Sequence, residues 1–271
     1  MKFRPKQPDT IVNRAGTHPL LELFWMVGGL ILIVGMLFLA LGLITDLSVK
    51  KIPLKVERVI GEKLVPGFPG TRLTSLDPLL TQIMNKVPED SIVHRYGVKL
   101  YSYESPEINA LAMPGGRILI SEGLLKALES ENELVMVLGH ELGHYDQRDH
   151  LRGLGRGLGM VVLASLITGP NSRMTDFVMT TFLSFQLNYS RAQESSADEF
   201  GVELLIKHYG HGGGSIEFFD RLLVNNPHPP EFLSTHPDPE NRIDHIRELI
   251  KRSSAGMGDT VPFQIPVELT K

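Results

Sequence analysis

A long apolar run near the start of this chain limits the folds that it can adopt. Residues 23–44, LFWMVGGLILIVGMLFLALGLI, contain no charged side chain. At about 1.5 Å of rise per residue, a helix of this length crosses the roughly 30 Å hydrocarbon core of a bilayer. The alternative is a cleaved signal peptide, but the run is longer than the apolar part of such a peptide and no A-x-A-like cleavage site follows. We therefore expect one retained transmembrane anchor over residues 23–46, in contact with the lipid bilayer through residues 23–44.

Positive charges flank this run on both sides, so charge alone gives a near tie in orientation. A short basic N-terminal segment, residues 1–22 here, usually stays in the cytoplasm, and a large following domain can be translocated regardless of its charge. We expect the N-terminus inside and the following domain outside, on the periplasmic side of a bacterial inner membrane. The flanking charges are Lys2, Arg4, Lys6 and Arg14 before the run, and Lys50, Lys51, Lys55 and Arg58 after it.

The charge and the cysteine count exclude several classes of function. The chain of 271 residues has a net charge of −4, so it lacks the basic face that nucleic-acid binding usually needs, and we expect no nucleic-acid partner. It contains no cysteine, which excludes disulfides, thiolate metal ligands and cysteine nucleophiles. Only histidine and carboxylate side chains remain to hold a metal ion. Nothing in the sequence predicts an oligomeric state.

The rest of the chain alternates between helical and strand-like patterns, which predicts a mainly helical α+β fold with a small β-sheet. Residues 47–70 are rich in proline and glycine and are expected to form a linker. One domain over residues 71–254 and a loosely held C-terminal tail, residues 255–271, should follow. The apolar segment 157–168 is short for a span, so we expect a buried core helix there, with a membrane-dipping segment as the alternative. Strands are expected at 98–104 and 117–121, and helices from Ser75, from about Asn132, over 176–208 and over 239–252.

The motif HELGH, residues 140–144, places His140 and His144 four residues apart. On a helix this spacing puts both imidazoles on one face, where they can occupy two corners of a zinc tetrahedron. Glu141 lies about 100° further round the helix, where it can take a proton from an attacking water. The alternative is a helix that carries histidines by chance. The apolar context, and the poor helix formers Gly139 and Gly143, indicate instead that another element approaches this face closely.

Two carboxylates with the same spacing, Glu194 and Asp198, lie about fifty residues further along in SRAQESSADEFG. A catalytic zinc usually has three protein ligands, and Glu194 can supply the third. Asp198 can accept a hydrogen bond from the outer N–H of a ligand histidine, with His140 as the candidate, and so hold its tautomer. The alternative is that both are solvated helix carboxylates, but the small residues between them favour a helix pressed against another.

Four motifs occur in a fixed order in this chain. They are N-A-x-x-x-P-G-G at 109–116, HELGH at 140–144, R-A-x-E-x-x-A-D at 191–198, and S-T-H-P with N-R-I at 234–243. In this combination the chain resembles the HtpX and CAAX prenyl protease family of zinc peptidases, which are gluzincins, over about residues 75–252. The similarity is closer to envelope members with one catalytic domain than to multi-span members.

The resemblance implies a zincin-like metalloprotease domain with one Zn²⁺ per chain. It implies that His140, His144 and Glu194 are the zinc ligands and that Glu141 is the catalytic base. The implied function is that of a membrane-anchored zinc endopeptidase, which hydrolyses unfolded or misassembled envelope or membrane proteins. No motif that would hold a free N-terminus is present, which disfavours an aminopeptidase. A chaperone-like envelope assembly factor with gated or minor proteolysis is the alternative.

The resemblance also implies that the strand around Asn109 and Ala110 is an exposed edge, to which a polypeptide substrate adds as an extra strand. The alternative for Asn109 is a turn residue.

His236, in a proline-stiffened loop, is a further candidate catalytic residue. It could stabilise the oxyanion of the tetrahedral intermediate, or it could fill the fourth ligand position and hold the enzyme latent. A structural hydrogen bond is the third alternative. Arg242, Arg191 and Tyr189 are candidates to donate to substrate or to brace the carboxylates. Arg148 and His150 are expected to continue the HELGH helix as salt-bridge or surface residues.

Overall fold

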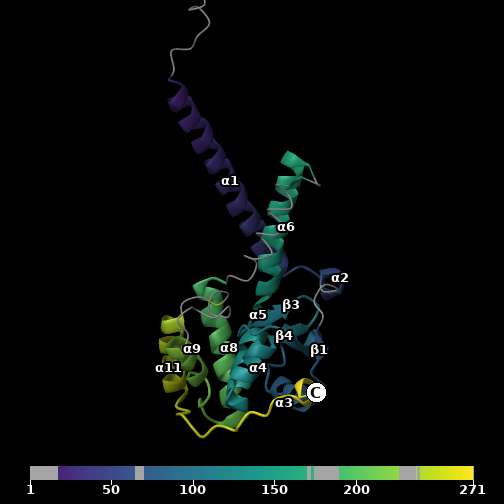
Figure 1. Ribbon diagram of the computed structural model, residues 1–271, viewed down its shortest axis with the longest axis vertical. Coiled ribbons are helices and arrows are strands. Elements are labelled where there is room, and N and C mark those ends of the chain that lie inside the picture. The colour runs from purple at the N-terminus through teal and green to yellow at the C-terminus, as the bar shows by residue number, and fades with distance from the viewer. Residues whose placement is uncertain are drawn as a thin grey trace, which may run out of the picture.

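The computed structural model describes residues 18–64, 70–169, 172–173, 189–225, 236 and 239–270. One long N-terminal helix extends away from a domain that holds a small sheet and most of the other helices (Figure 1). The expected α+β class is confirmed. The helices are α1 (Pro19–Val49), α2 (Leu54–Leu64), α3 (Asp77–Met84), α4 (Glu122–Ala127), α5 (Glu131–Gln147), α6 (Asp149–Thr168), α8 (Arg191–Tyr209), α9 (Glu217–Asn225) and α11 (Pro239–Ser253), with 3-10 turns η1 (Thr74–Leu76), η2 (Ile92–Arg95) and η3 (Val267–Leu269); the strands are β1 (Thr71–Arg72), β2 (Lys99–Tyr103), β3 (Ala110–Met113) and β4 (Arg117–Ser121).

Helix α1 is longer than the predicted anchor at both ends. His18 caps its start, with Nδ1 accepting a hydrogen bond from the backbone N–H of Leu20 at 3.4 Å. The helix continues past Ile44 to Val49. It is the helix among the described residues that is long and apolar enough to cross a membrane, and nearly all of its apolar surface is exposed.

The expected linker contains a helix that packs against the domain. In α2, Glu57 is completely buried. Its carboxylate accepts hydrogen bonds from the hydroxyl of Tyr96 at 2.8 Å and from Nε2 of His150 at 2.7 Å, a bond that requires the proton on that nitrogen. Residues 54–64 are therefore part of the domain, because a buried carboxylate with two partners fixes the helix in place.

The sheet has the strand order β1-β2-β4-β3. β2 and β4 run parallel, while β1 and β3 pair antiparallel with β2 and β4. Within the described part of the chain β3 pairs only with β4, so it is an edge strand as expected. The side chains of Asn109 and Ala110 are nevertheless buried rather than exposed, because α5 packs against β3. Two glycines with positive φ, Gly115 and Gly116, close the turn between β3 and β4.

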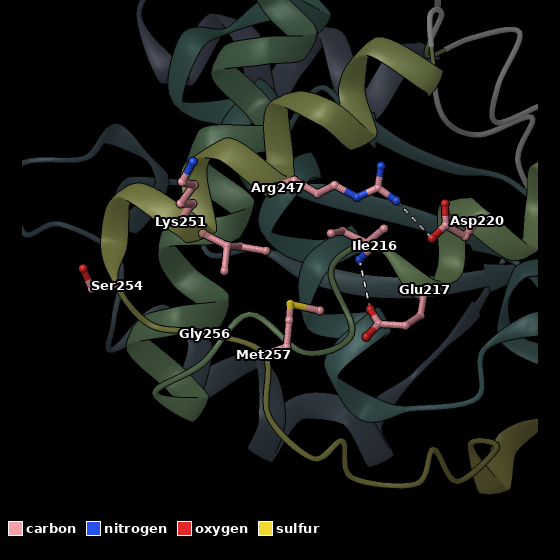
Figure 2. Close-up of a pocket in the computed structure, with 9 residues that line it drawn as sticks. Ile216, Glu217, Asp220, Arg247, Lys251, Ser254, Gly256 and Met257 are labelled. Carbon is pink, nitrogen blue, oxygen red and sulfur yellow. Dashed lines mark hydrogen bonds and ion pairs between the residues drawn. The ribbon is translucent and has the colours of Figure 1, made fainter.

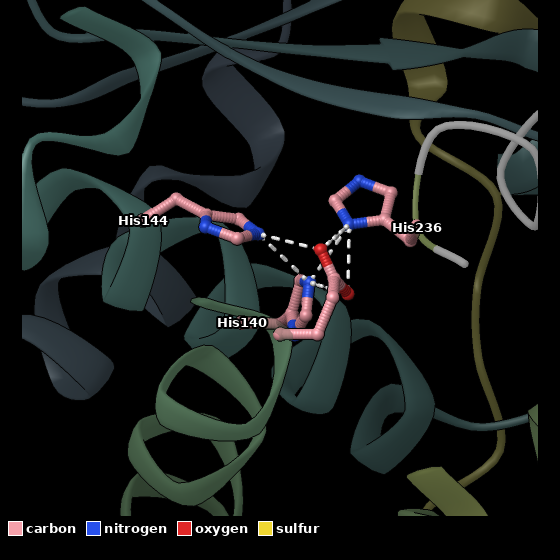
Figure 3. A group of neighbouring side chains, drawn as sticks. His140, His144 and His236 are labelled. Atoms are coloured by element: carbon pink, nitrogen blue, oxygen red, sulfur yellow. Dashed lines mark hydrogen bonds and ion pairs between the residues drawn. The ribbon is translucent and has the colours of Figure 1, made fainter. Parts of the chain in front are cut away.

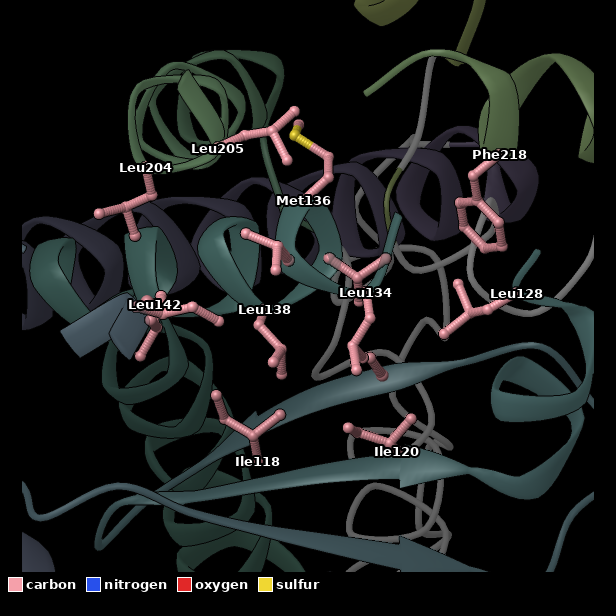
Figure 4. Close-up of a cluster of buried hydrophobic side chains, with 14 of the residues drawn as sticks. Ile118, Ile120, Leu128, Leu134, Met136, Leu138, Leu142, Leu204, Leu205 and Phe218 are labelled. Atoms are coloured by element: carbon pink, nitrogen blue, oxygen red, sulfur yellow. The ribbon is translucent and has the colours of Figure 1, made fainter. Parts of the chain in front are cut away.

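The core lies between the sheet, α5 and α8 (Figure 4). Ile118 and Ile120 of β4 face Leu134 and Leu138 of α5, and Leu205 of α8 lies on the other side of α5. All five side chains are completely buried. Burial of each such side chain stabilises the fold by about 1.5–3 kcal/mol relative to its exposure. This packing places one face of α5 directly against α8.

Glycines allow α5 and α8 to approach closely. A Cβ on Gly139 would lie 2.8 Å from the Cα of Gly201, and a Cβ on Gly143 would lie 2.9 Å from the Cα of Ala197. Real Cβ atoms essentially never approach backbone this closely. The close approach expected from the glycines of the HELGH helix is thus confirmed, and α8 is the neighbour.

Helix α5 ends earlier than predicted. Arg148 adopts the left-handed conformation with φ 58°, so α5 stops at Gln147 and α6 begins at Asp149. Arg148 and His150 form salt bridges, as expected, but both are buried and their partner is Glu57. Helix α6 is not the buried core helix that the sequence predicted, because it leaves the domain beside α1 (Figure 1).

Two other predicted boundaries change. The helix expected from residue 176 is described from Arg191, where Ser190 forms a capping box with Gln193; residues 176–188 lie outside the described residues. The tail is not loosely held. The backbone N–H of Glu131 donates to the carbonyl of Val261 at 2.8 Å, and the carboxylate of Glu268 accepts hydrogen bonds from residues 74 and 75.

Candidate metal centre

Four buried side chains from three parts of the chain converge at one point (Figure 3). His140 and His144 come from α5, Glu194 comes from the first turn of α8, and His236 comes from the segment before α11. One ligand atom of each lies within 4.8 Å of the others, and none of the four is more than 1% exposed. The structure therefore brings together every residue that the sequence proposed for metal ligation, with His236 among them.

A carboxylate orients each histidine of the HELGH motif. Nδ1 of His140 lies 2.9 Å from Oδ1 of Asp198, and Nδ1 of His144 lies 3.0 Å from Oδ2 of Asp149. Since a carboxylate only accepts hydrogen bonds, this network assigns the proton of each ring to Nδ1. The two Nε2 atoms then present their lone pairs to each other, 3.1 Å apart. Two facing lone pairs at this distance repel unless a proton or a metal ion lies between them.

The distances between the donor atoms match the size of a zinc site. Tetrahedral zinc with bonds of about 2.0–2.1 Å separates its ligand atoms by about 3.3 Å. Here Nε2 of His140 lies 3.0 Å from Nδ1 of His236, and Nε2 of His144 lies 3.5 Å from Oε1 of Glu194. Nitrogen and carboxylate oxygen are both donors that zinc accepts. The residues therefore fit one zinc ion, bound by up to four side chains.

Arg242 braces the two carboxylates of α8. Its Nε and Nη2 donate to the two oxygens of Asp198 at 2.8 and 2.6 Å, and its Nη1 lies 3.0 Å from Oε2 of Glu194. Burial alone would raise the pKa of Asp198, but the guanidinium lowers it to about 2. Burial and the same guanidinium lower the pKa of His140 to about 3, which keeps this imidazole neutral and able to bind a metal.

The surroundings of His144 are more negative. Burial alone would lower the pKa of this imidazole, but the hydrogen bond with Asp149 and the neighbouring Glu194 raise it to about 9. This environment favours a positive charge at the position where a cation would sit.

Glu141 lies beside the cluster without belonging to it. Its carboxylate is completely buried, and its oxygens make no hydrogen bond of good geometry with the described residues. Nε2 of His236 lies 3.6 Å from Oε1 of Glu141. Burial raises the pKa of Glu141. A raised pKa is typical of a carboxylate that exchanges protons near neutral pH.

The sequence did not predict that Asp149 belongs to the centre, and it gave Tyr189 only as a candidate donor. Asp149, completely buried at its side chain, also accepts hydrogen bonds from Gln193 of α8 at 2.7 Å and Arg152 at 2.6 Å. Its position one residue beyond the left-handed Arg148 gave no helical spacing by which to find it. Tyr189 stacks on His144, with ring centroids 3.8 Å apart and an interplanar angle of 16°.

The backbone of Ala112 in β3 lies close enough to Glu141 to lower the pKa of this carboxylate, although burial outweighs the effect. Asn109, just before β3, is 1% exposed. Its backbone N–H and carbonyl both pair with Ser121, but the two polar atoms of its carboxamide have no hydrogen-bond partner among the described residues. An unpaired buried amide costs about 1–3 kcal/mol, so this side chain is set up to bind a further group.

A separate cavity of about 630 Å³ lies between α9, α11 and the segment after α11 (Figure 2). It carries charges of both signs, with Arg247 3.7 Å from Asp220. Its lining includes none of the motif residues, so it is distinct from the metal centre.

The arrangement of these residues is typical of the HExxH class of zinc metallopeptidases. Two histidines and a glutamate sit on two tightly packed helices, and a buried glutamate stands beside them. Residues 77–250 match the profile of Peptidase family M48, which covers more than half of the chain. The chain belongs to peptidase family M48. The resemblance predicted from the motifs is confirmed at the level of this family.

Three relatives illustrate the similarity, and their names differ from HtpX and CAAX prenyl protease. The chain is 27% identical over 225 residues to the beta-barrel assembly-enhancing protease of Escherichia coli, covering 73% of this chain and 46% of that protein. It is 28% identical over 176 residues to the mitochondrial metalloendopeptidase OMA1 of Bos taurus, covering 57% and 32%. It is 28% identical over 187 residues to the metalloprotease YcaL of Escherichia coli, covering 67% and 70%. The chain thus spans less than half the length of the first two of these relatives.

Proposed function

We propose that this protein is a membrane-anchored zinc endopeptidase that cleaves unfolded or misassembled envelope or membrane proteins. The observation that carries the proposal is the convergence of His140, His144 and Glu194 next to a buried glutamate with a raised pKa. We assign these three side chains as the zinc ligands and Glu141 as the catalytic base. Asp198 and Asp149 hold the ligand histidines in the binding tautomer.

Zinc, when bound, would supply a Lewis acid that polarises the scissile carbonyl and makes water more acidic. The protein's own groups do the rest. Glu141 takes a proton from the attacking water and passes it to the leaving amine. Its complete burial suits both halves of this task, because a pKa raised toward neutrality lets the carboxylate accept and release a proton at similar cost.

The substrate would bind as an extended strand along β3. A peptide that adds to a sheet edge forms backbone hydrogen bonds whatever its sequence, which suits unfolded substrates. The β3 edge runs beside Glu141, so an added strand would bring a peptide bond to the base. The carboxamide of Asn109, which is buried and has no hydrogen-bond partner in the described part of the chain, would bind the main chain of this peptide.

His236 would keep the enzyme latent by occupying the fourth ligand position. In support, Nδ1 of His236 lies 3.0 Å from both Nε2 of His140 and Oε1 of Glu194, among the other donor atoms. When His236 moves away, its place becomes available to water and substrate, and a role in stabilising the oxyanion is the alternative. A gated site is also compatible with the second candidate function, which is that of a chaperone-like assembly factor with minor proteolysis.

The cellular setting follows from α1 and from the relatives. We infer that α1 anchors the protein in a bacterial inner membrane with the catalytic domain on the periplasmic side, as a single-anchor envelope member of its family. The name of the Escherichia coli relative links that protein to β-barrel assembly, which supports a role in quality control of envelope proteins.

Metal analysis and proteolysis test the proposal together. The full chain, purified in detergent, should contain one zinc per chain and cleave an unstructured protein such as reduced casein. Glu194→Ala should lose the zinc, whereas Glu203→Ala, on the exposed face of the same helix, should keep it. Unchanged zinc content in Glu194→Ala would remove Glu194 from the ligand set. Cleavage that continues in a zinc-free protein would overturn the proposed reaction.

A further inference from the structure

Helix α6 leaves the catalytic domain on the same side as α1, and the two helices cross near their bases (Figure 1). The two helices are antiparallel where they touch, and their contacts keep a constant register. A Cβ on Gly155 would lie 2.6 Å from Cγ2 of Thr45, and a Cβ on Gly159 would lie 2.9 Å from Cδ2 of Leu41. A step of four residues along α6 therefore matches a step of four back along α1. By this register Gly157 is level with residue 43.

The polarity of both helices changes at this same level. In α1 the uncharged run ends at Ile44 and Asp46 follows. In α6 the last charged residue is Arg156, and residues 157–168, GLGMVVLASLIT, carry no charge. On the polar side of this level, Nε of Arg152 lies 3.6 Å from Oδ1 of Asp46. Two segments far apart in the sequence thus pass from polar to apolar in one plane, as expected where that plane is a membrane surface.

The base of the helix pair is fixed to the domain. Nη1 of Arg148 donates to the carbonyls of Val49 and Ile52, both at 2.7 Å, and so binds the C-terminal end of α1. Val49 and Ile52 also pack against Leu151 and Leu154 at the start of α6. The buried guanidinium is held in turn by Glu57. The anchor therefore has a defined orientation relative to the catalytic domain.

We propose that α6 is a second membrane-embedded helix, which enters the bilayer beside α1 and reaches about one leaflet deep. The proposal rests on the proposed membrane anchoring by α1. Twelve residues of helix span about 18 Å, slightly more than half of the hydrocarbon core. A polar group at this depth needs an internal partner, and the hydroxyl of Thr168 donates to the carbonyl of Ala164 at 2.9 Å.

This arrangement sets the height of the metal site above the membrane. Asp149, which orients His144, is the first residue of α6. Gly157 lies eight positions after Asp149, which corresponds to a rise of about 12 Å along the helix. The site would therefore act on polypeptide segments close to the bilayer surface, such as the membrane-proximal parts of misassembled membrane proteins.

The absence of cysteine makes a direct test possible, because each introduced cysteine is unique. Ala164→Cys and Thr168→Cys probe α6, Leu39→Cys is the control within α1, and Glu203→Cys in α8 is the control in water. The full-length variants, shown to retain zinc, are reconstituted into vesicles of phosphatidylethanolamine and phosphatidylglycerol. The first readout is the rate at which the unlabelled cysteine reacts with a membrane-impermeant maleimide. The second readout uses protein labelled with a polarity-sensitive fluorophore and measures the quenching of its fluorescence by nitroxides on the lipid chains.

Both α6 positions should react at least tenfold more slowly than Glu203→Cys and should be quenched by chain nitroxides, like Leu39→Cys. If both α6 positions react as fast as Glu203→Cys while Leu39→Cys is protected, the insertion of α6 is overturned and the anchoring by α1 still holds. Protection without quenching would also overturn the insertion of α6, because a second copy of the chain or another protein would then cover α6. A Leu39→Cys variant that reacts freely would instead show that the anchoring by α1 is wrong.

Discussion

Nδ1 of His236 lies 3.0 Å from Oε1 of Glu194, although the two residues are 42 positions apart in the chain. This distance places an imidazole among the donor atoms of the metal centre. It is the contact on which the proposed latency of the enzyme depends.

Replacing His236 tests whether this contact is a latch. His236→Ala should retain one zinc per chain, because His140, His144 and Glu194 remain, and should cleave reduced casein faster. A latch that stabilises the closed state by about 1.4 kcal/mol gives about a tenfold increase. A loss of cleavage at unchanged zinc content would instead assign His236 to the oxyanion, and a loss of zinc would make it an essential ligand.

Removing the base should separate binding from chemistry. Glu141→Gln keeps the size of the side chain but cannot take a proton, so kcat should fall by about 10²–10⁴-fold while zinc content stays the same. Glu203→Gln, on the surface of α8, is the matched control and should leave both values unchanged. If a strain that carries Glu141→Gln keeps the normal composition of its envelope, the assembly role outweighs proteolysis.

The carboxylates behind the histidines should tune zinc affinity. Asp149→Asn and Asp198→Asn preserve shape but replace a charged acceptor, and each should weaken zinc binding by about 10–100-fold in a chelator competition. Asp244→Asn, on the exposed side of α11, is the control. Equal zinc affinity in Asp149→Asn and the unsubstituted protein would show that the contact with His144 is not needed to orient the ring.

The close packing of α5 on α8 should tolerate no added methyl group. Gly143→Ala would place its Cβ against the Cα of Ala197, and separating the helices should cost about 1–3 kcal/mol and weaken zinc binding. Gly28→Ala in α1, where no atom lies within 4 Å, is the control and should not lower the melting temperature. A zinc affinity unchanged in Gly143→Ala would show that this spacing does not position the ligands.

The buried Glu57 should make stability depend on acid pH. Burial alone would raise its pKa, but the hydrogen bond from His150 and the nearby Arg148 lower it below the ordinary value of 4.5. A carboxylate with a lowered pKa in the folded state stabilises the protein above its unfolded pKa, and this contribution is lost as the pH falls through the folded value. The melting temperature should therefore drop below about pH 4.5, and less steeply in Glu57→Gln. Parallel curves for the two proteins would contradict this role.

Much of the metal centre could be predicted because its spacing is local. His140 and His144, like Glu194 and Asp198, are pairs separated by one helical turn, so a helical pattern is enough to place each pair on one face. The length and polarity of α1 were predictable for a similar reason, since crossing a bilayer depends on length and composition. The start of β4 was predictable because Gly115 and Gly116 mark the turn before it.

The failures lie where contacts are distant in the sequence. Asp149 reaches His144 because Arg148 adopts a left-handed conformation, and Arg148 is held there by the carbonyls at the end of α1 and by Glu57. Such a conformation costs an L-residue about 1–2 kcal/mol and is offset by these tertiary contacts, which no local pattern encodes. The same contacts made residues 54–64 part of the domain rather than a linker.

The chemistry of this protein can be recognised from local periodicity, which reveals two histidines, their carboxylates and an apolar helix. How these parts are joined depends on the tertiary structure. It placed His236 inside the centre and joined the end of α1 to Arg148, the residue before the one that orients His144. It also directed α6 out of the domain beside α1, because the packing of these side chains depends on where distant segments meet.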